Sequence, residues 1–170
     1  GLADSAYNDR RKSCENVAAA ICKYHPEVKS LRDANYELLD EVRGEVSKED
    51  ALRAHYVIGE KERVMEVSAA LEKEDYEEVG KKMYETHDGL SREYEVSCPE
   101  LDFLVDVARD CGVSGARVMG GGFGGCTINL VSQELYANFI DKARKSYQEK
   151  FGKAPIVIDV VIGDGARKLC

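Results

Sequence analysis

The sequence lacks several features that would place it at once in a common functional class. It has no apolar run approaching the roughly 20 residues that cross a bilayer. Its net charge of −8 argues against a surface that binds nucleic acid or anionic lipid. The first residues do not show the basic-then-apolar organisation of a secretory signal. We therefore expect a cytoplasmic protein with no nucleic-acid or membrane partner.

Cysteine and histidine are present, but without the spacing of a metal site. The six cysteines are scattered, contain no C-x-x-C pair and lie mostly in apolar periodic segments, as small buried residues do. His25, His55 and His87 are far apart in the sequence, so we expect structural or solvated roles for them. The sequence predicts free thiols and no metal site in this chain.

The 170 residues are enough for one domain with a proper core, and their pattern changes after two-thirds of the chain. Apolar spacing and capping residues predict helices over residues 5–24, 30–42, 47–70, 75–94 and 99–111. Runs rich in β-branched residues predict strands over 116–119, 126–131 and 156–162, the last one central, with a helix over 133–151. This order indicates an α+β domain in which helices pack on one face of a small antiparallel or mixed sheet.

The most distinctive segment is a glycine loop, because five of the six residues from Gly120 to Gly125 are glycine. Backbone N–H groups without side chains can wrap an anion or a small polar ligand. The string satisfies G-x-G-x-x-G, but a strand rather than a helix follows it, which excludes a dinucleotide fingerprint. No lysine follows the glycines, which excludes a Gly-Lys-Ser/Thr phosphate loop. A wide hairpin turn and a binding loop remain, and the six-residue length favours binding.

A second polar concentration lies near the N-terminus, in the segment Tyr7-Asn8-Asp9-Arg10-Arg11-Lys12. It combines a phenol, an amide and three cations within one or two helical turns. It is either an exposed helix start with ordinary surface ion pairs or a polar rim that faces a ligand. The residues alone leave both interpretations open.

Several stretches, in the same order along the chain, resemble the galactokinases of the GHMP kinase superfamily. Gly115–Thr127 resembles the third signature of that family, and Ser5–Glu15 is similar to its S-x-Y-x-x-R-R-x-x-C-E segment. The stretch Tyr94–Asp102, with the sequence YEVSCPELD, is similar to a galactokinase hallmark. His55–Glu60 and Asp164–Arg167 are weaker agreements. The resemblance covers essentially all 170 residues of this chain, and it concerns only the C-terminal portion of the family's proteins.

The resemblance implies that residues 1–170 form a GHMP kinase C-terminal domain, ferredoxin-like and elaborated with helices. The N-terminal ATP-binding and catalytic domain would then be absent from this chain. The implied reaction transfers the γ-phosphoryl group of Mg-ATP to the C1 hydroxyl of galactose and gives galactose 1-phosphate. The family's serine-rich phosphate loop and catalytic aspartate have no counterpart here. We therefore expect no catalytic residue and no metal ligand in this chain, and no turnover by the chain alone.

The resemblance also implies a set of binding residues. By position in its motif, Tyr7 corresponds to the tyrosine that lines the galactose pocket. Gly120, Gly121 and Gly122 correspond to the backbone that closes over the sugar beside the phosphates. Met119 stands where the family usually has threonine. The implied ligands are galactose and ATP with Mg, the implied intramolecular partner is the missing domain, and we expect self-association through the exposed face around Tyr7 and the glycine loop.

Two other functions stay open at this point. One is a non-catalytic regulatory relative that binds galactose and ATP and signals to a partner. The other is a related kinase that acts on N-acetylgalactosamine or another hexose. The motifs that would separate these functions from a galactokinase lie outside the chain.

Overall fold

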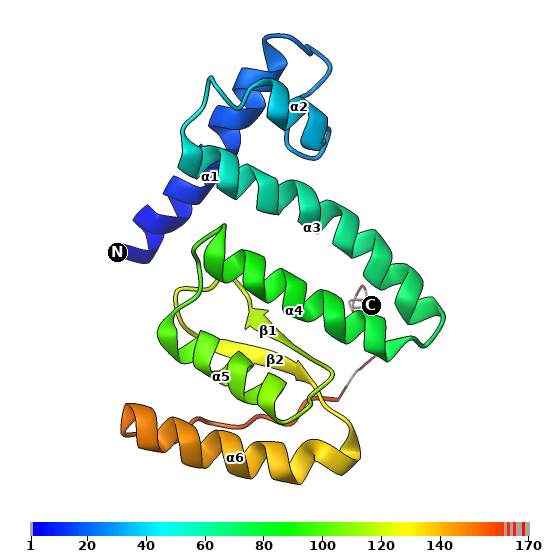
Figure 1. The fold of residues 1–170 in the computed structure, drawn as a ribbon, viewed down its shortest axis with the longest axis vertical. Helices are drawn as coiled ribbons and strands as arrows, with labels where there is room; N and C mark the ends of the chain where they lie inside the picture. Colours follow the sequence, from blue (N-terminus) through cyan, green and yellow to red (C-terminus); the bar gives the residue numbers. More distant parts are fainter. Residues whose placement is uncertain (1, 162, 164, 166–167, 169–170) are drawn as a thin grey trace.

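The structure is a computed structural model, and it describes residues 2–161, 163, 165 and 168 (Figure 1). Two predictions fall partly outside the described residues. The strand predicted over 156–162 loses Ile162, and the weak resemblance at Asp164–Arg167 loses Asp164, Ala166 and Arg167. The helices and strands are, in chain order, α1 (Leu2–Cys22), α2 (Tyr36–Glu41), α3 (Lys48–Glu72), α4 (Tyr76–Arg92), α5 (Pro99–Asp110), β1 (Gly115–Met119), β2 (Cys126–Leu130) and α6 (Gln133–Phe151).

The elements form two packed groups that meet where α3 lies along α4 (Figure 1). The first group is α1, α2 and α3. Its core is aliphatic and excludes water completely at Val17, Ile21, Leu39, Ala54 and Ile58. Because each helix contributes only one apolar stripe, none of the three could bury its core residues without the other two.

The second group contains α4, α5, the sheet and α6. Val105, Ala108, Ala116, Phe139 and Ala143 form its core, which joins α5, β1 and α6. The strands β1 and β2 pair antiparallel, and the glycine loop connects them. A small antiparallel sheet packed among helices confirms the predicted α+β class.

A glycine contact fixes the position of β1 against α4. A Cβ atom on Gly80 would lie 2.0 Å from the carbonyl oxygen of Ser114, and one on Gly115 would lie 2.5 Å from the Cα atom of Gly80. Only glycine on both sides allows the two backbones to approach this closely. The contact sets the start of β1, and therefore the direction in which the chain enters the glycine loop.

The predicted starts of α3, α4 and α5 are confirmed, the first two by side-chain caps. The Ser47 side chain accepts a hydrogen bond from the backbone N–H of Asp50 at 3.0 Å. The Asp75 side chain does the same for the N–H of Glu78 at 3.1 Å. Pro99 occupies the first turn of α5, where a missing N–H costs nothing. Capping residues therefore locate these helices from the sequence alone.

The helix predicted over 30–42 is wrong in its first half. There the Asp33 carboxylate accepts a hydrogen bond from the backbone N–H of Ser30 at 3.1 Å, which closes a separate turn. The helix α2 instead follows Asn35, whose side chain accepts from the N–H of Leu38 at 2.9 Å. In a capping box the serine accepts from the N–H three residues later, whereas here the Ser30 hydroxyl accepts from the N–H of Arg32 at 3.2 Å, as in an isolated turn.

The central strand predicted over 156–162 is also wrong for the residues that the structure describes. Residues 156–161 are not in a strand, and Ile156 and Val161 are almost fully exposed. A β-branched run forms a strand only beside a backbone partner. Among the described residues this run has no such partner, so its intrinsic preference is not expressed.

Two expectations from composition can be compared with the structure. The five cysteines that the structure describes are all free, as predicted: Cys14, Cys22, Cys98, Cys111 and Cys126. Among the described helices, none combines the length and the apolar character needed to span a bilayer.

Candidate functional site

The glycine loop has a backbone that requires its unusual composition. The φ angles of Gly120, Gly122, Gly124 and Gly125 are 78°, 81°, 122° and 90°. Side-chain-bearing residues rarely adopt these angles. Phe123, the one residue of the loop with a side chain, is itself held at a φ of 58°. The glycines therefore build a specific turn between β1 and β2.

Tyr7 lies directly against this loop. A Cβ atom on Gly121 would lie 1.9 Å from the hydroxyl oxygen of Tyr7, so the bare glycine makes room for the phenol. The Tyr7 ring also meets the Phe123 ring edge to face, with centroids 5.2 Å apart and an interplanar angle of 78°. The ring remains half-exposed. The structure thus brings together Tyr7 and Gly121, which the sequence placed far apart along the chain.

The other two predicted glycines have different surroundings. A Cβ atom on Gly122 would lie 2.2 Å from the carbonyl oxygen of Val96, so Gly122 faces the protein rather than Tyr7. Gly120 has open space around it and is exposed. Met119, at the end of β1, is exposed as well. One glycine therefore packs on the tyrosine, one anchors the loop, and one is free to meet a ligand.

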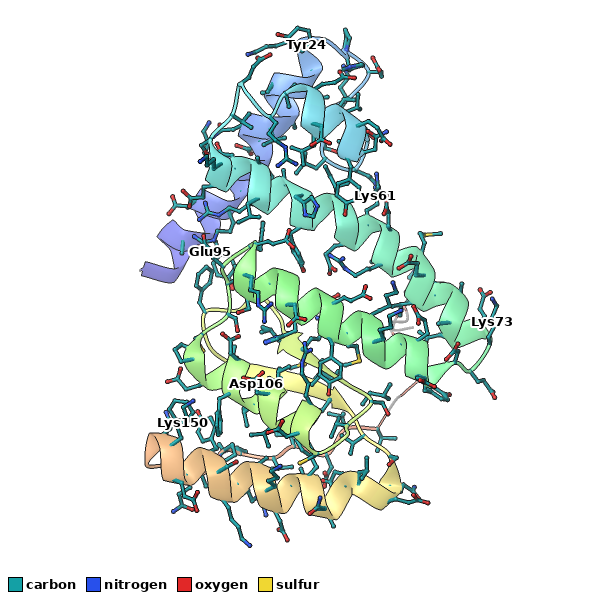
Figure 2. All side chains as sticks on the ribbon, viewed as in Figure 1. Tyr24, Lys61, Lys73, Glu95, Asp106 and Lys150 are labelled. Atoms are coloured by element: carbon teal, nitrogen blue, oxygen red, sulfur yellow. The ribbon has the colours of Figure 1, made fainter. Side chains whose placement is uncertain are left out.

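Residues 94–97 support the glycine loop. The backbone N–H of Phe123 donates to the carbonyl oxygen of Val96 at 2.6 Å. Glu95 has a φ of 54°, which turns the segment sharply between α4 and α5. Figure 2 labels Glu95 at this junction, where the chain after α4 comes close to α1. The hallmark stretch recognised in the sequence thus includes the support of the glycine loop.

Arg10 ties this support to α1. Its Nε donates to the carbonyl oxygen of Tyr94 at 3.0 Å, and a terminal nitrogen donates to that of Glu95 at 2.5 Å. The guanidinium also lies 5.3 Å from the centre of the Phe123 ring. Arg11, by contrast, pairs with Glu15 on the exposed surface at 2.8 Å. Arg11 thus agrees with the interpretation as an ordinary surface ion pair, whereas Arg10 is occupied with the support of the glycine loop.

A second arginine holds the same segment from α3. Arg53 is buried and donates to the Ser13 hydroxyl at 3.0 Å and to the Glu95 carboxylate at 3.1 Å. Beside it, the Tyr94 hydroxyl lies 3.9 Å from the Cys14 sulfur, and burial raises the pKa of Tyr94 to about 12. Tyr94 is therefore a neutral phenol at physiological pH, with a structural role.

The C-terminal side of the segment is fixed by Asp102 of α5. Its carboxylate accepts hydrogen bonds from the hydroxyls of Ser97 at 2.5 Å and Ser91 at 3.0 Å. The Nε2 atom of His87 lies 3.2 Å from the same carboxylate, and burial lowers the pKa of His87. The ring is thus neutral near pH 7, and Asp102 connects α4, α5 and the loop support.

The three histidines do not converge. His25 lies 2.8 Å from a carboxylate oxygen of Glu41, and His55 lies 2.6 Å from one of Glu93. Each ring is thus paired with a different carboxylate, as His87 is with Asp102, which agrees with the structural or solvated roles expected for them. Arg10, Val96 and Asp102 were not singled out individually from the sequence, although each lies within or beside a stretch that carried the resemblance.

The arrangement around Tyr7 is suited to binding. The phenol offers a flat apolar face and a hydroxyl, and Gly120 offers backbone groups with open space beside them. The arginines and Asp102 are occupied in holding the support in place. Together these residues form a wall whose side chains are held in place by hydrogen bonds and packing.

Comparison with known proteins shows which family this chain is similar to. Residues 67–149 match the family model described as the C-terminal domain of GHMP kinases. This match includes β1, β2 and the whole glycine loop. In this region the chain is similar to the C-terminal domain of the GHMP kinases.

The similarity to individual GHMP kinases extends beyond that match. The human galactokinase is 44% identical over 99% of this chain, and the Thermotoga maritima galactokinase is 37% identical over 99%. The structure of the Lactococcus lactis galactokinase complexed with galactose superposes on 91% of this chain with a TM-score of 0.81 and 27% identity. The chain covers 41% and 46% of the two curated relatives and 40% of the solved chain, so it spans less than half of each.

Proposed function

We propose that this chain supplies the sugar-binding side of a galactokinase. The parent enzyme would transfer the γ-phosphoryl group of ATP to the C1 hydroxyl of galactose and release galactose 1-phosphate. The observation that carries the proposal is the packing of Tyr7 on Gly121, because it joins two motifs of the same family into one wall. The relatives that align with 99% of the chain, such as the human protein, are galactokinases.

In this proposal Tyr7 and the loop bind and orient the sugar. The Tyr7 hydroxyl would hydrogen-bond a hydroxyl of galactose, and backbone groups from Gly120 to Gly122 would close over the ring. Phosphoryl transfer depends mainly on positioning and on charge stabilisation, so a rigid wall that orients the accepting hydroxyl contributes directly to the rate. The contacts of Arg10 and Asp102 with the loop support provide that rigidity.

ATP with Mg would supply the phosphoryl group when bound. Within the described residues, no group of three or more His, Cys, Asp or Glu side chains is arranged to hold a metal ion. We therefore assign the metal ligands, the phosphate loop and the catalytic aspartate to the part of the parent enzyme that lies beyond this chain. The chain alone is expected to give no turnover.

The test is a comparison of the isolated chain with a fused protein. In the fused protein, this chain is joined to the part of the human galactokinase that its alignment leaves uncovered. ATP consumption with galactose is expected only in the fused protein. Turnover by the isolated chain would contradict the assignment of the catalytic groups.

The same assay separates the alternatives. Activity with N-acetylgalactosamine or another hexose in place of galactose would show a related sugar kinase. Binding of galactose and ATP without turnover by the fused protein would show that this chain does not complete a galactokinase site, which is the result expected of a regulatory relative. In either case the wall formed by Tyr7 and the glycine loop would keep its binding role, and the reaction assigned to it would change.

The proposal includes one property of the isolated chain, self-association, and one of the parent enzyme, its location in the cell. The face around Tyr7 and the glycine loop would meet the rest of the parent enzyme, so its exposure is expected to cause self-association, measurable by sedimentation at increasing concentration. We also place the parent enzyme in the cytoplasm. The free state of all five described cysteines supports a reducing compartment.

A further inference from the structure

The two packed groups of the fold have separate hydrophobic cores. The buried residues of the first core lie between Val17 and Ile58, and those of the second lie between Val105 and Ala143. Among the described residues, neither core cluster contains a residue of the other group. We call the contact between the groups, where α3 lies along α4, the seam. Units that share no large apolar interface are expected to move relative to each other.

Polar side-chain pairs cross the seam along its length. Tyr56 of α3 also packs there, because a Cβ atom on Gly89 of α4 would lie 2.3 Å from its ring. Polar pairs near the surface each contribute little to stability, so opening part of the seam costs little. The pairs are Arg53 with Glu95 at 3.1 Å, His55 with Glu93 at 2.6 Å, Glu60 with Thr86 at 2.9 Å, and Glu66 with Lys82 at 2.8 Å.

The two groups are joined by the short connection between α3 and α4. In this connection, residues 73–75, Glu74 has a φ of 56°. Figure 2 labels Lys73 and Glu95 at opposite ends of the seam. Arg53 lies about 30 Å along α3 from Lys73, so a rotation of about 6° at the connection moves the Arg53 end by about 3 Å. A contact at the Glu95 end therefore resists such a rotation most effectively.

The wall formed by Tyr7 and the glycine loop spans the same seam. Tyr7 belongs to α1 and therefore to the first group, whereas Gly121 lies between β1 and β2 in the second. The phenol occupies the space that a side chain on Gly121 would need. A displacement of α1 by a few Å would separate them, so the wall is complete only while the seam is closed at this end.

Arg53 connects α1 to the loop support at this end of the seam. One terminal nitrogen donates to the Ser13 hydroxyl of α1 at 3.0 Å, and the other donates to the Glu95 carboxylate at 3.1 Å. Arg53 also pairs with Glu49 on its own helix. Its Nε atom is buried and has no hydrogen-bond partner among the described residues, which costs stability. Stability alone is therefore a weak reason for a buried arginine at this position.

We propose that Arg53 and Glu95 are positioning residues that hold the seam closed and thereby keep Tyr7 against Gly121. We call this pair the latch. When the latch opens, α1 turns away about the connection between α3 and α4, and Tyr7 leaves the loop. Arg10 bonds backbone carbonyl oxygens beside the latch and limits the extent of opening. That the closed state binds the sugar more tightly rests on the proposed function, whereas the latch itself does not depend on the sugar.

An NMR measurement on the isolated chain tests the latch directly. The nuclear Overhauser effect (NOE) between the rings of Tyr7 and Phe123 reports their contact, and it is recorded at a concentration at which the chain is monomeric. Glu95→Gln removes the charge that Arg53 binds, and the Glu95 side chain is half-exposed, so the fold should tolerate the change. We expect the NOE to weaken at least about twofold. Glu93→Gln, which removes another carboxylate pair of the seam, should leave it unchanged.

A second variant tests the other end of the bridge. Ser13→Ala removes the hydroxyl through which Arg53 holds α1, and it should weaken the same NOE. An unchanged NOE in both Glu95→Gln and Ser13→Ala would overturn the proposal. An equal loss in Glu93→Gln would also overturn it, because the whole seam rather than the latch would then hold Tyr7.

Kinetics of the fused protein separate the latch from the proposed function. Glu95→Gln is expected to raise KM for galactose by the factor by which the closed population falls, with kcat nearly unchanged, because saturating sugar restores the closed state. A purely structural Glu95 would lower the unfolding midpoint and leave both the NOE and KM unchanged. A weakened NOE without a change in KM would confirm the latch and contradict the binding of the sugar at Tyr7.

Discussion

The glycine loop and the segment after α6 both have a distinctive amino-acid composition, yet they differ in how they pack and hydrogen-bond in the structure. The loop is held by the Val96 carbonyl and packed against Tyr7. Residues 156–161 form no backbone hydrogen bond with the rest of the described chain. A strong local pattern therefore becomes structure only where its partners lie within the same chain. The measurements below test this contrast, in order of decreasing effect.

The largest effect is expected where the loop meets its support. Gly122→Ala places a methyl group 2.2 Å from the Val96 carbonyl oxygen at a φ of 81°. We expect the free energy of unfolding to fall by about 3 kcal/mol, measured by urea denaturation. Gly44→Ala is the control, because a Cβ atom there has open space, and it should change stability by less than about 0.5 kcal/mol. Equal effects would mean that the loop is not fixed by this contact.

An intermediate effect is expected for the arginine that ties α1 to the loop support. Arg10→Met removes two hydrogen bonds to carbonyl oxygens and the contact with the Phe123 ring, which should cost about 2 kcal/mol. Arg11→Met removes only a surface pair with Glu15 and should cost less than about 0.5 kcal/mol. Thermal or urea unfolding of the two variants side by side checks the difference. A larger loss for the Arg11 variant would reverse our assignment of the two residues.

A smaller, pH-dependent effect is expected from His87. Burial lowers its pKa from the ordinary value of 6.5, so below that pH the unfolded chain binds a proton that the folded chain does not. The contribution of His87 is present above about pH 6.5 and is lost as the pH falls, and His87→Gln should flatten the decline in stability between about pH 8 and about pH 5.

His25 provides a control of opposite sign for the same titration. A hydrogen bond to Glu41 raises its pKa, so its contribution is present at low pH and is lost as the pH rises. His25→Gln should therefore make the acid decline steeper. If both variants shift the pH profile in the same direction, the environments that we assign to the two rings are wrong.

The smallest effect is expected in the segment after α6. Ile158→Ala removes a side chain that touches little of the isolated chain, so the free energy of unfolding should change by less than about 0.5 kcal/mol. The same substitution in the fused protein should cost more than about 1 kcal/mol, because the side chain would then be buried against the rest of the parent enzyme. Equal costs in the two proteins, measured by urea denaturation, would show that the fused protein does not bury this segment.

Local rules predicted much of the fold. Ser47 and Asp75 cap their helices as expected, because capping is decided within four residues. The pair Ser30 and Asp33 failed because the same residue types also close an isolated turn. The strand predicted at 156–162 failed because its composition says nothing about where its partner lies. The errors occur where two outcomes share one local pattern.

The candidate site was predictable only in part. The glycine content of the loop indicated a special backbone, and the family resemblance connected Tyr7 to it. The contact between Tyr7 and Gly121, however, depends on how α1 packs against the rest of the fold. The spacing of residues in the sequence does not predict that packing. The choice of the Tyr94 and Glu95 carbonyls as partners of Arg10 is also set by tertiary packing.

The measurement that tests the account most directly is galactose phosphorylation by the fused protein with and without Tyr7→Phe. The substitution keeps the ring on Gly121 and removes only the hydroxyl that we assign to the sugar. We predict an active fused protein whose KM for galactose rises about tenfold in the variant, as expected for the loss of one hydrogen bond. Identical kinetics for the two proteins would contradict the placement of the sugar against Tyr7 and the glycine loop.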